Sequence, residues 1–144
     1  GNKEQYDIEK ILMVDKINDI ALVRIENTGG VVLELGVAAE VAIGDRIYSV
    51  GNPHPKGDAE KLIGNLDGTF AEGIISGIRP VPNTGVQVFQ YTAATDHGSS
   101  GGPIINNQGK VIAVVKWKLG ANSAYAGAPV NYLKDLLKKN KLDK

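Results

Sequence analysis

The chain has 144 residues, 42% of them hydrophobic and 22% charged, and its 16 basic side chains balance 16 acidic ones. This length gives room for one domain or two small barrels, and a neutral chain offers no electrostatic reason to bind nucleic acid or an anionic membrane. The absence of cysteine excludes disulfides, cysteine-based zinc sites and a cysteine nucleophile.

Short apolar runs separated by glycine-containing turns predict an all-β protein that ends in one helix. The expected strands lie near Ile8–Val14, Ile20–Ile25, Arg46–Gly51, Thr69–Ile78, Val86–Thr92, Pro103–Ile105, Val111–Trp117 and Ala124–Pro129. Residues 106–109 have the composition of a hairpin turn between two of these strands. The polar stretch from Pro53 to Asp67 is expected to form a long surface loop.

The last segment has the spacing of an amphipathic helix. Its apolar stripe consists of Val130, Leu133, Leu136 and Leu137. Asn131 is the predicted N-cap, because its side chain can accept a hydrogen bond from a free backbone N–H of the first turn. The lysines that follow the stripe would lie at the negative end of the helix dipole, as at an ordinary solvated helix terminus.

Residues 98–103 read Gly-Ser-Ser-Gly-Gly-Pro. A nucleophilic hydroxyl needs a tight turn whose backbone N–H groups can face a developing oxyanion, and glycines permit such a turn because they lack Cβ. Ser100 is therefore the candidate nucleophile, and the N–H groups of Gly98 and Ser100 are the candidate oxyanion donors. The alternative is a Gly/Ser-rich hairpin loop without chemistry.

Asn18 and Asp19 directly precede the apolar run that starts at Ile20. The acid of a catalytic triad requires this placement: anchored at a strand edge, largely buried and turned toward an imidazole. A lone Asp more often forms or caps a turn. Asp19 is therefore a candidate triad acid only in combination with the serine motif.

Six landmarks follow one another in a fixed order along the chain. They are residues 19–23 (Asp-Ile-Ala-Leu-Val), 44–53, 73–77, 98–103, 109–114 and 128–131. Together they resemble the protease domain of the trypsin-like family, of the bacterial HtrA/Deg type. The resemblance covers about Tyr6 to Leu137 and implies a chymotrypsin-like double β-barrel with its active site between the barrels. It divides the chain into a remnant of the first barrel (1–34), a complete second barrel (35–130) and a C-terminal helix (131–144).

Position by position, the resemblance implies a serine endopeptidase with Ser100 as nucleophile, Asp19 as triad acid, and Gly98 and Ser100 as oxyanion-hole donors. It implies protein or peptide substrates, and it implies no cofactor and no metal. The expected substrate-binding residues are Ala94 and Thr95 at the base of the primary pocket, and Val115, Lys116 and Trp117 on the strand that pairs with the substrate backbone. By resemblance alone, a periplasmic, secreted or cell-envelope location is favoured.

The triad histidine is the main departure from the family pattern. In the family it precedes the Asp, yet none of the 18 residues before Asp19 is a histidine. The two histidines of the chain, His54 and His97, are expected to be loop residues and not the general base. The preferred interpretation is a piece of a longer protease whose N-terminal segment supplies the histidine. The alternative is a catalytically silent, protease-like module that binds peptides.

An incomplete first barrel would leave open strand edges and apolar faces in the N-terminal region. Exposed strand edges recruit other strands. We therefore expect the region either to self-associate, as in a homo-oligomer, or to contact the absent N-terminal segment.

Overall fold

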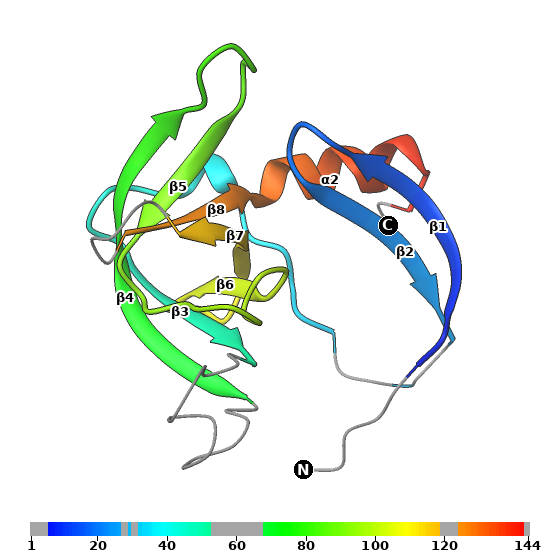
Figure 1. Cartoon of the computed structure of the whole chain (residues 1–144), viewed down its shortest axis with the longest axis horizontal. Coiled ribbons are helices and arrows are strands. Elements are labelled where there is room, and N and C mark those ends of the chain that lie inside the picture. Colours follow the sequence, from blue (N-terminus) through cyan, green and yellow to red (C-terminus); the bar gives the residue numbers. More distant parts are fainter. Residues whose placement is uncertain (1–5, 27–28, 30–31, 53–67, 119–123, 143–144) are drawn as a thin grey trace.

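The structure, a computed structural model, describes residues 6–26, 29, 32–52, 68–118 and 124–142. Strands dominate it, in a two-stranded sheet and a closed six-stranded barrel, and a helix follows the last strand (Figure 1). This arrangement confirms the predicted mainly-β class, with one complete barrel and a smaller second sheet. His54 and the loop predicted for residues 53–67 lie outside the described residues.

The first two strands, β1 (Ile8–Asp15) and β2 (Ile20–Ile25), form an antiparallel hairpin that lies beside the barrel (Figure 1). Several of its large apolar side chains are exposed, namely Ile8, Ile11, Val14, Ile17, Val23 and Ile25. Because a two-stranded hairpin is only marginally stable by itself in water, this one depends on packing against other parts of the molecule.

The barrel closes in the strand order β3-β4-β5-β8-β7-β6. Its strands are β3 (Arg46–Gly51), β4 (Thr69–Pro80), β5 (Gln87–Tyr91), β6 (Pro103–Asn106), β7 (Val111–Lys118) and β8 (Tyr125–Pro129). All neighbouring pairs are antiparallel, and the pairing of β3 with β6 completes the circle. A closed barrel has no open strand edges, whereas the two-stranded hairpin does have them.

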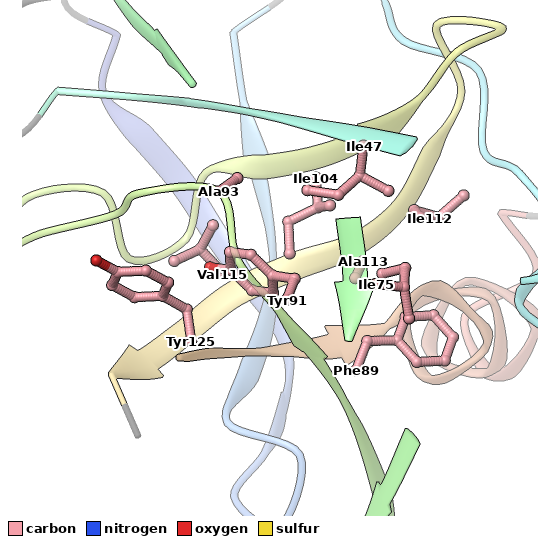
Figure 2. Close-up of a cluster of buried hydrophobic side chains, with 10 residues drawn as sticks. All are labelled: Ile47, Ile75, Phe89, Tyr91, Ala93, Ile104, Ile112, Ala113, Val115 and Tyr125. Atoms are coloured by element: carbon pink, nitrogen blue, oxygen red, sulfur yellow. The ribbon is translucent and has the colours of Figure 1, made fainter. Parts of the chain in front are cut away.

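The barrel core forms because successive residues of a strand point to opposite faces of the sheet. In β3, for example, Ile47 and Ser49 are buried whereas Arg46 is exposed. Figure 2 shows the buried cluster, which consists of Ile47, Ile75, Phe89, Tyr91, Ala93, Ile104, Ile112, Ala113, Val115 and Tyr125. The rings of Tyr91 and Tyr125 stack with their centroids 5.7 Å apart.

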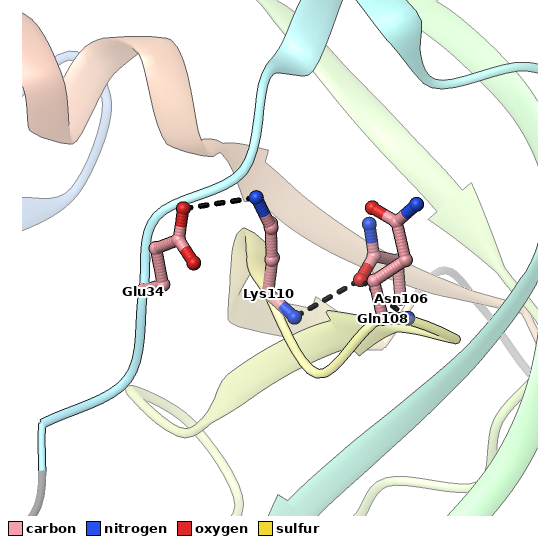
Figure 3. Close-up of polar contacts among 4 residues, drawn as sticks. All are labelled: Glu34, Asn106, Gln108 and Lys110. Carbon is pink, nitrogen blue, oxygen red and sulfur yellow. Dashed lines mark hydrogen bonds and ion pairs between the residues drawn. The ribbon is translucent and has the colours of Figure 1, made fainter.

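The turn between β6 and β7 has the predicted hairpin form (Figure 3). Asn106 organises it: the side-chain Oδ1 accepts the N–H groups of Gln108 and Lys110, each at 3.0 Å, and the carbonyl accepts the N–H of Gly109 at 3.0 Å. The Lys110 ammonium also reaches Glu34 Oε1 at 2.9 Å. This exposed ion pair joins the turn to the segment that leads from the hairpin to the barrel.

The helix α2 (Val130–Lys139) begins directly where β8 ends. Its N-cap is Pro129, which makes no side-chain capping hydrogen bond, so the prediction of Asn131 as the N-cap is wrong. The strand runs into the helix without a loop, and Asn131 consequently falls inside the first turn. Within the described residues, no helix is long and apolar enough to cross a membrane.

A second apolar cluster joins the hairpin to the barrel and the helix. Ile20 of β2, Ala128 of β8 and Leu136 of α2 are buried in contact with one another. Met13, Leu22, Tyr132 and Leu133 pack against them. This cluster therefore sets the position of the hairpin turn, which carries Asp19, relative to the barrel, which carries Ser100.

Candidate active site

The segment just before Ser100 is a tight turn. The Ser99 N–H donates a hydrogen bond to the Asp96 carbonyl at 2.9 Å, and Gly98, the third residue, has a φ of 95°. His97, the second residue, does not have a positive φ. A positive φ at the third position alone is the pattern of a type II turn, which glycine adopts without Cβ strain.

Ser100 is the second residue of another type II turn that follows at once. The Gly102 N–H donates to the Ser99 carbonyl at 3.0 Å, and Gly101 has a φ of 86°. Ser99 is buried, whereas Ser100 is exposed. Among the contacts of the described residues, the backbone N–H groups of Gly98 and Ser100 have no protein acceptor. The two turns therefore leave both of these N–H groups available to a ligand.

The second turn is anchored to strand β7. The Gly101 N–H donates to the Val115 carbonyl, and the Val115 N–H donates to the Gly102 carbonyl, each at 2.9 Å. The Ser100 hydroxyl donates to the carbonyl of Lys116 at 3.0 Å. Three hydrogen bonds thus fix Ser100 beside the middle of β7.

A cavity of about 200 Å³ opens beside Ser100. Its lining residues are Thr95, Asp96, His97, Ser100, Val115, Lys116 and Trp117. Of the five substrate-binding residues expected from the sequence, Ala94 is exposed and does not line this cavity, and the other four do. Two larger cavities lie along α2, and Ser100 does not line either of them. The cavity beside Ser100 is therefore distinguished by the chemistry of its lining residues and not by its volume.

Two lining residues, Asp96 and His97, were not expected in the cavity wall. They reach it because the first turn folds back toward Ser100. Behind Thr95, the Tyr91 hydroxyl lies 3.2 Å from the Thr95 hydroxyl. Burial raises the pKa of Tyr91 to about 12, so this hydroxyl stays protonated through the neutral pH range. Within the described parts of the chain, no three His, Asp or Glu side chains gather as metal ligands would.

Asp19 lies in the β1–β2 turn, directly before Ile20, as the sequence predicted. Its side chain is exposed and not largely buried, because no described residue covers the turn from outside. Its φ of 55° falls in the left-handed region, which Asp tolerates better than most residues. Among the contacts of the described residues, no hydrogen bond joins Asp19 to Ser100 or His97.

Asp15 and Asn18 build the turn that carries Asp19, a role that the sequence analysis missed. Asp15 Oδ1 accepts the N–H groups of Ile17 and Asn18, each at 3.0 Å, and Oδ2 accepts the Asn18 side-chain amide at 2.7 Å. These bonds hold the pKa of the Asp15 carboxyl below its usual value, and the side-chain bond from Asn18 has the largest effect. The sequence does contain a signal for this role, because Asp15 stands at the end of an apolar run, where an Asp side chain commonly bonds to the backbone of a turn.

Lys116 occupies a β-bulge in β7. In the pairing with β8, Val115 lies opposite Gly127 and Trp117 lies opposite Ala126, so Lys116 is the extra residue. A bulge bends its strand and re-aims a side chain. The Lys116 side chain is buried, with only 7% of the residue exposed, and Nζ lies 4.1 Å from the centroid of the Trp117 ring.

Comparison with known proteins shows the family to which the chain belongs. The family model of the trypsin-like peptidase domain matches residues 1–114. Serine protease HtrA-like from Staphylococcus aureus (strain USA300) is 33% identical over 94% of this chain and 19% of its own length. Serine protease HTRA2, mitochondrial, from Bos taurus is 33% identical over 88% of this chain and 27% of its own length. The chain thus spans about a fifth to a quarter of these relatives, and it belongs to the trypsin-like peptidase family.

Proposed function

We propose that this chain is the nucleophile-bearing part of a serine endopeptidase that hydrolyses peptide bonds in proteins through an acyl-enzyme at Ser100. The observation that carries the proposal is the pair of consecutive turns at residues 96–102, which exposes Ser100 and leaves the N–H groups of Gly98 and Ser100 without a protein acceptor. Such N–H groups, next to a nucleophile, are what an oxyanion hole requires. Membership of the trypsin-like peptidase family supports the same conclusion.

In this mechanism, Ser100 Oγ attacks the carbonyl carbon of the scissile peptide bond. A histidine takes the hydroxyl proton and passes it to the leaving amine, while Asp19 fixes the tautomer of that histidine. The N–H groups of Gly98 and Ser100 stabilise the negative oxygen of the tetrahedral intermediate. In the second half of the reaction, the histidine takes a proton from water, and the water oxygen attacks the acyl carbon. The proton then passes to Ser100 Oγ as the ester bond breaks, which releases the carboxylic acid product.

The general base is proposed to come from chain that precedes this sequence. Residues 1–18 contain no histidine, and the Ser100 hydroxyl bonds to a carbonyl and not to His97. The exposed apolar side chains of the hairpin are the surface that such a preceding segment would cover, since strand edges and apolar faces attract further strands. A second copy of the chain is the other candidate to cover it.

The substrate is proposed to lie along β7 and in the cavity beside Ser100. When the Ser100 hydroxyl turns toward a base, it releases the Lys116 carbonyl, which can then accept an N–H of an extended peptide. Thr95 and Trp117 line the space where the side chain before the scissile bond would sit. Ala94, which does not line the cavity, is retained only as a candidate neighbour of that site.

A catalytically silent, peptide-binding module is the second candidate function. The observation that favours it is the hydrogen bond that ties the Ser100 hydroxyl to the Lys116 carbonyl, whereas among the described residues no histidine or carboxylate is hydrogen-bonded to that hydroxyl. The two candidates predict the same peptide-binding surface along β7. They differ in whether a bond is broken.

The deciding experiment measures hydrolysis of an unfolded protein substrate by a longer chain that extends this sequence at its N-terminus to include the proposed histidine. We expect activity that Ser100→Ala abolishes and that Asp19→Asn lowers by about 10⁴, because the amide would present the wrong histidine tautomer. Ser76→Ala is the control, since the Ser76 hydroxyl is buried in β4 without a hydrogen-bond partner among the described residues. Tight peptide binding without any hydrolysis would favour the silent module.

A further inference from the structure

Tyr91 places a hydroxyl group inside the barrel core, close to the cavity beside Ser100. It is the last residue of β5, none of its surface is exposed, and its ring stacks on that of Tyr125 with the centroids 5.7 Å apart. Figure 2 shows the ring within the buried cluster that also contains Val115, a residue of the cavity wall. A hydroxyl in such surroundings needs a hydrogen-bond partner, because a buried polar group without one is costly.

Thr95 supplies that partner. Its Oγ1 lies 3.2 Å from the Tyr91 hydroxyl oxygen, and among the contacts of the described residues neither hydroxyl has another hydrogen-bond partner. Thr95 differs from Tyr91 in that it is half-buried and lines the cavity. The pair holds two hydroxyl protons, and only one of them can lie between the two oxygens. The other proton must therefore point elsewhere.

The surroundings decide which of the two hydroxyls donates. If Thr95 donated, the Tyr91 proton would remain in the core without an acceptor, which is the costly case. If Tyr91 donates, the remaining proton belongs to Thr95 and can reach the cavity, where water or a ligand accepts it. Burial also raises the pKa of Tyr91 to about 12, so this residue keeps the proton that it donates at neutral pH. The Thr95 hydroxyl thus offers its own proton to the cavity.

We propose that Thr95 is a specificity-determining residue, whose hydroxyl proton binds an oxygen in the substrate side chain before the scissile bond, and that Tyr91 is the positioning residue that holds this hydroxyl in place. The identity of the ligand rests on the proposed function, whereas the hydroxyl pair itself does not. The residues in the core of the barrel and those in the cavity wall are thereby joined through one hydrogen bond.

Threonine is the side chain that this cavity would take best. A volume of about 200 Å³ favours a small side chain. Val115 and the Trp117 ring offer apolar contacts to a methyl group, while Thr95 offers its proton to a hydroxyl oxygen. Valine has nearly the same shape as threonine but no acceptor. A comparison of threonine with valine at this position therefore isolates the hydrogen bond.

The test titrates two peptides, identical except that one ends in threonine and the other in valine, into the 144-residue chain. Binding is followed by the backbone amide resonances of residues 95–100. The terminal carboxylate stands for the acyl product and can accept the N–H groups of Gly98 and Ser100. We expect the threonine peptide to bind about 2- to 10-fold more tightly, as one neutral hydrogen bond commonly allows.

Thr95→Val should abolish this preference, and Thr95→Ser should keep it because the hydroxyl is retained. Since Thr95→Val leaves the Tyr91 hydroxyl without an acceptor, the double variant Tyr91→Phe/Thr95→Val, which lacks both hydroxyls, is measured beside it. It should show no preference either.

Tyr91→Phe alone should reduce the preference and leave the affinity for the valine peptide unchanged, whereas a merely structural role would weaken the binding of both peptides alike. Tyr132→Phe is the matched control. It removes a hydroxyl that accepts the N–H of Gln87, at the opposite end of β5, at 2.8 Å, and it should leave the preference as it is.

Equal affinity of the unsubstituted chain for the two peptides overturns the proposal. So does a preference that survives in Thr95→Val and in the double variant, or a failure of both peptides to shift residues 95–100. An unchanged preference in Tyr91→Phe overturns the positioning role. If Tyr91→Phe does not fold, Thr95→Val and Thr95→Ser decide. None of these measurements needs hydrolysis, so failure of the proposed function would be seen separately.

Discussion

The Ser100 hydroxyl donates a hydrogen bond to the Lys116 carbonyl at 3.0 Å. The candidate nucleophile is therefore held by the strand along which a substrate would lie. For Ser100 to attack a peptide, this bond must be exchanged for one to a base. The exchange would free the Lys116 carbonyl for a substrate N–H at the moment when the hydroxyl becomes reactive.

Substrate preference should reflect the lining of the cavity. A lysine or arginine side chain before the scissile bond would need a buried carboxylate at the pocket base, and Thr95, the residue expected at the base that does line the cavity, supplies none. We therefore expect the proposed longer protease to cleave after small or apolar side chains, as measured with a peptide library. Cleavage mainly after Lys or Arg would contradict this, and Asp96 in the cavity wall would then be the residue to replace by Asn.

Gly102→Ala should distort the serine turn. An added Cβ would collide with the backbone carbonyl of Val50 and approach the Ser99 carbonyl to 3.0 Å, and neither backbone atom can move cheaply. Overpacking of this kind costs about 1–3 kcal/mol, measurable by urea unfolding. Gly85→Ala, in open space at a φ of 71°, is the comparison: it strains a remote turn and should leave the amide resonances of residues 98–101 in place. Equal effects on those resonances would refute the steric argument.

Asp15→Asn should change how stability depends on pH. The folded chain holds the pKa of Asp15 below the ordinary value of 3.8, so the charged carboxylate adds stability above that pH, and the gain is lost as the pH falls through the lowered pKa. The amide keeps an oxygen for the N–H groups of Ile17 and Asn18 but lacks the charge. At pH 7, we expect the free energy of unfolding in urea to be lower for Asp15→Asn than for the unsubstituted chain. This difference should nearly vanish at a pH below the lowered pKa of Asp15. A loss of the same size at both pH values would indicate a purely structural role.

The hairpin should drive self-association when nothing else covers it. Ile8 and Ile11 are 60% and 62% exposed on a two-stranded sheet with free edges. Sedimentation of the 144-residue chain should reveal dimers or larger species, and Ile11→Lys should shift them toward monomer. Ile43→Lys changes a residue that is equally exposed, at 67%, but lies outside the hairpin, and it should have no such effect. A monomer at high concentration would count against the prediction.

The strands were predictable because apolar runs and turn residues mark them locally. The expected bounds of Ile20–Ile25 and Arg46–Gly51 are those of β2 and β3. The end of β8 at Pro129 was predicted, but the N-cap of α2 was placed at Asn131 because Asn is a common capping residue. The sequence does not reveal that the strand runs into the helix without a loop, so that Pro129 is itself the N-cap. Local patterns of this kind fix which element forms, but not how two elements join.

The candidate site was less predictable, since its geometry depends on contacts between distant segments. The Gly/Ser motif indicated the turn at Ser100, because glycine is needed where φ is positive. The burial of Lys116 could not be foreseen: a charged residue in a strand normally faces solvent, and a bulge leaves no signature in a sequence of this kind. The exposure of Asp19 was also unexpected, because burial of a turn depends on what packs over it.

The most direct test of the central claim is to locate the adduct formed by a fluorophosphonate, which reacts with activated serine hydroxyls. Without a base, the Ser100 hydroxyl is a poor nucleophile, so we expect the 144-residue chain to stay unmodified in intact-mass measurements. A longer chain that supplies the histidine proposed to precede Asp19 should gain one adduct, which fragmentation places on Ser100 and which Ser100→Ala prevents. A longer chain that contains the histidine and remains unmodified, or an adduct on another residue, would contradict the assignment of Ser100 as the nucleophile.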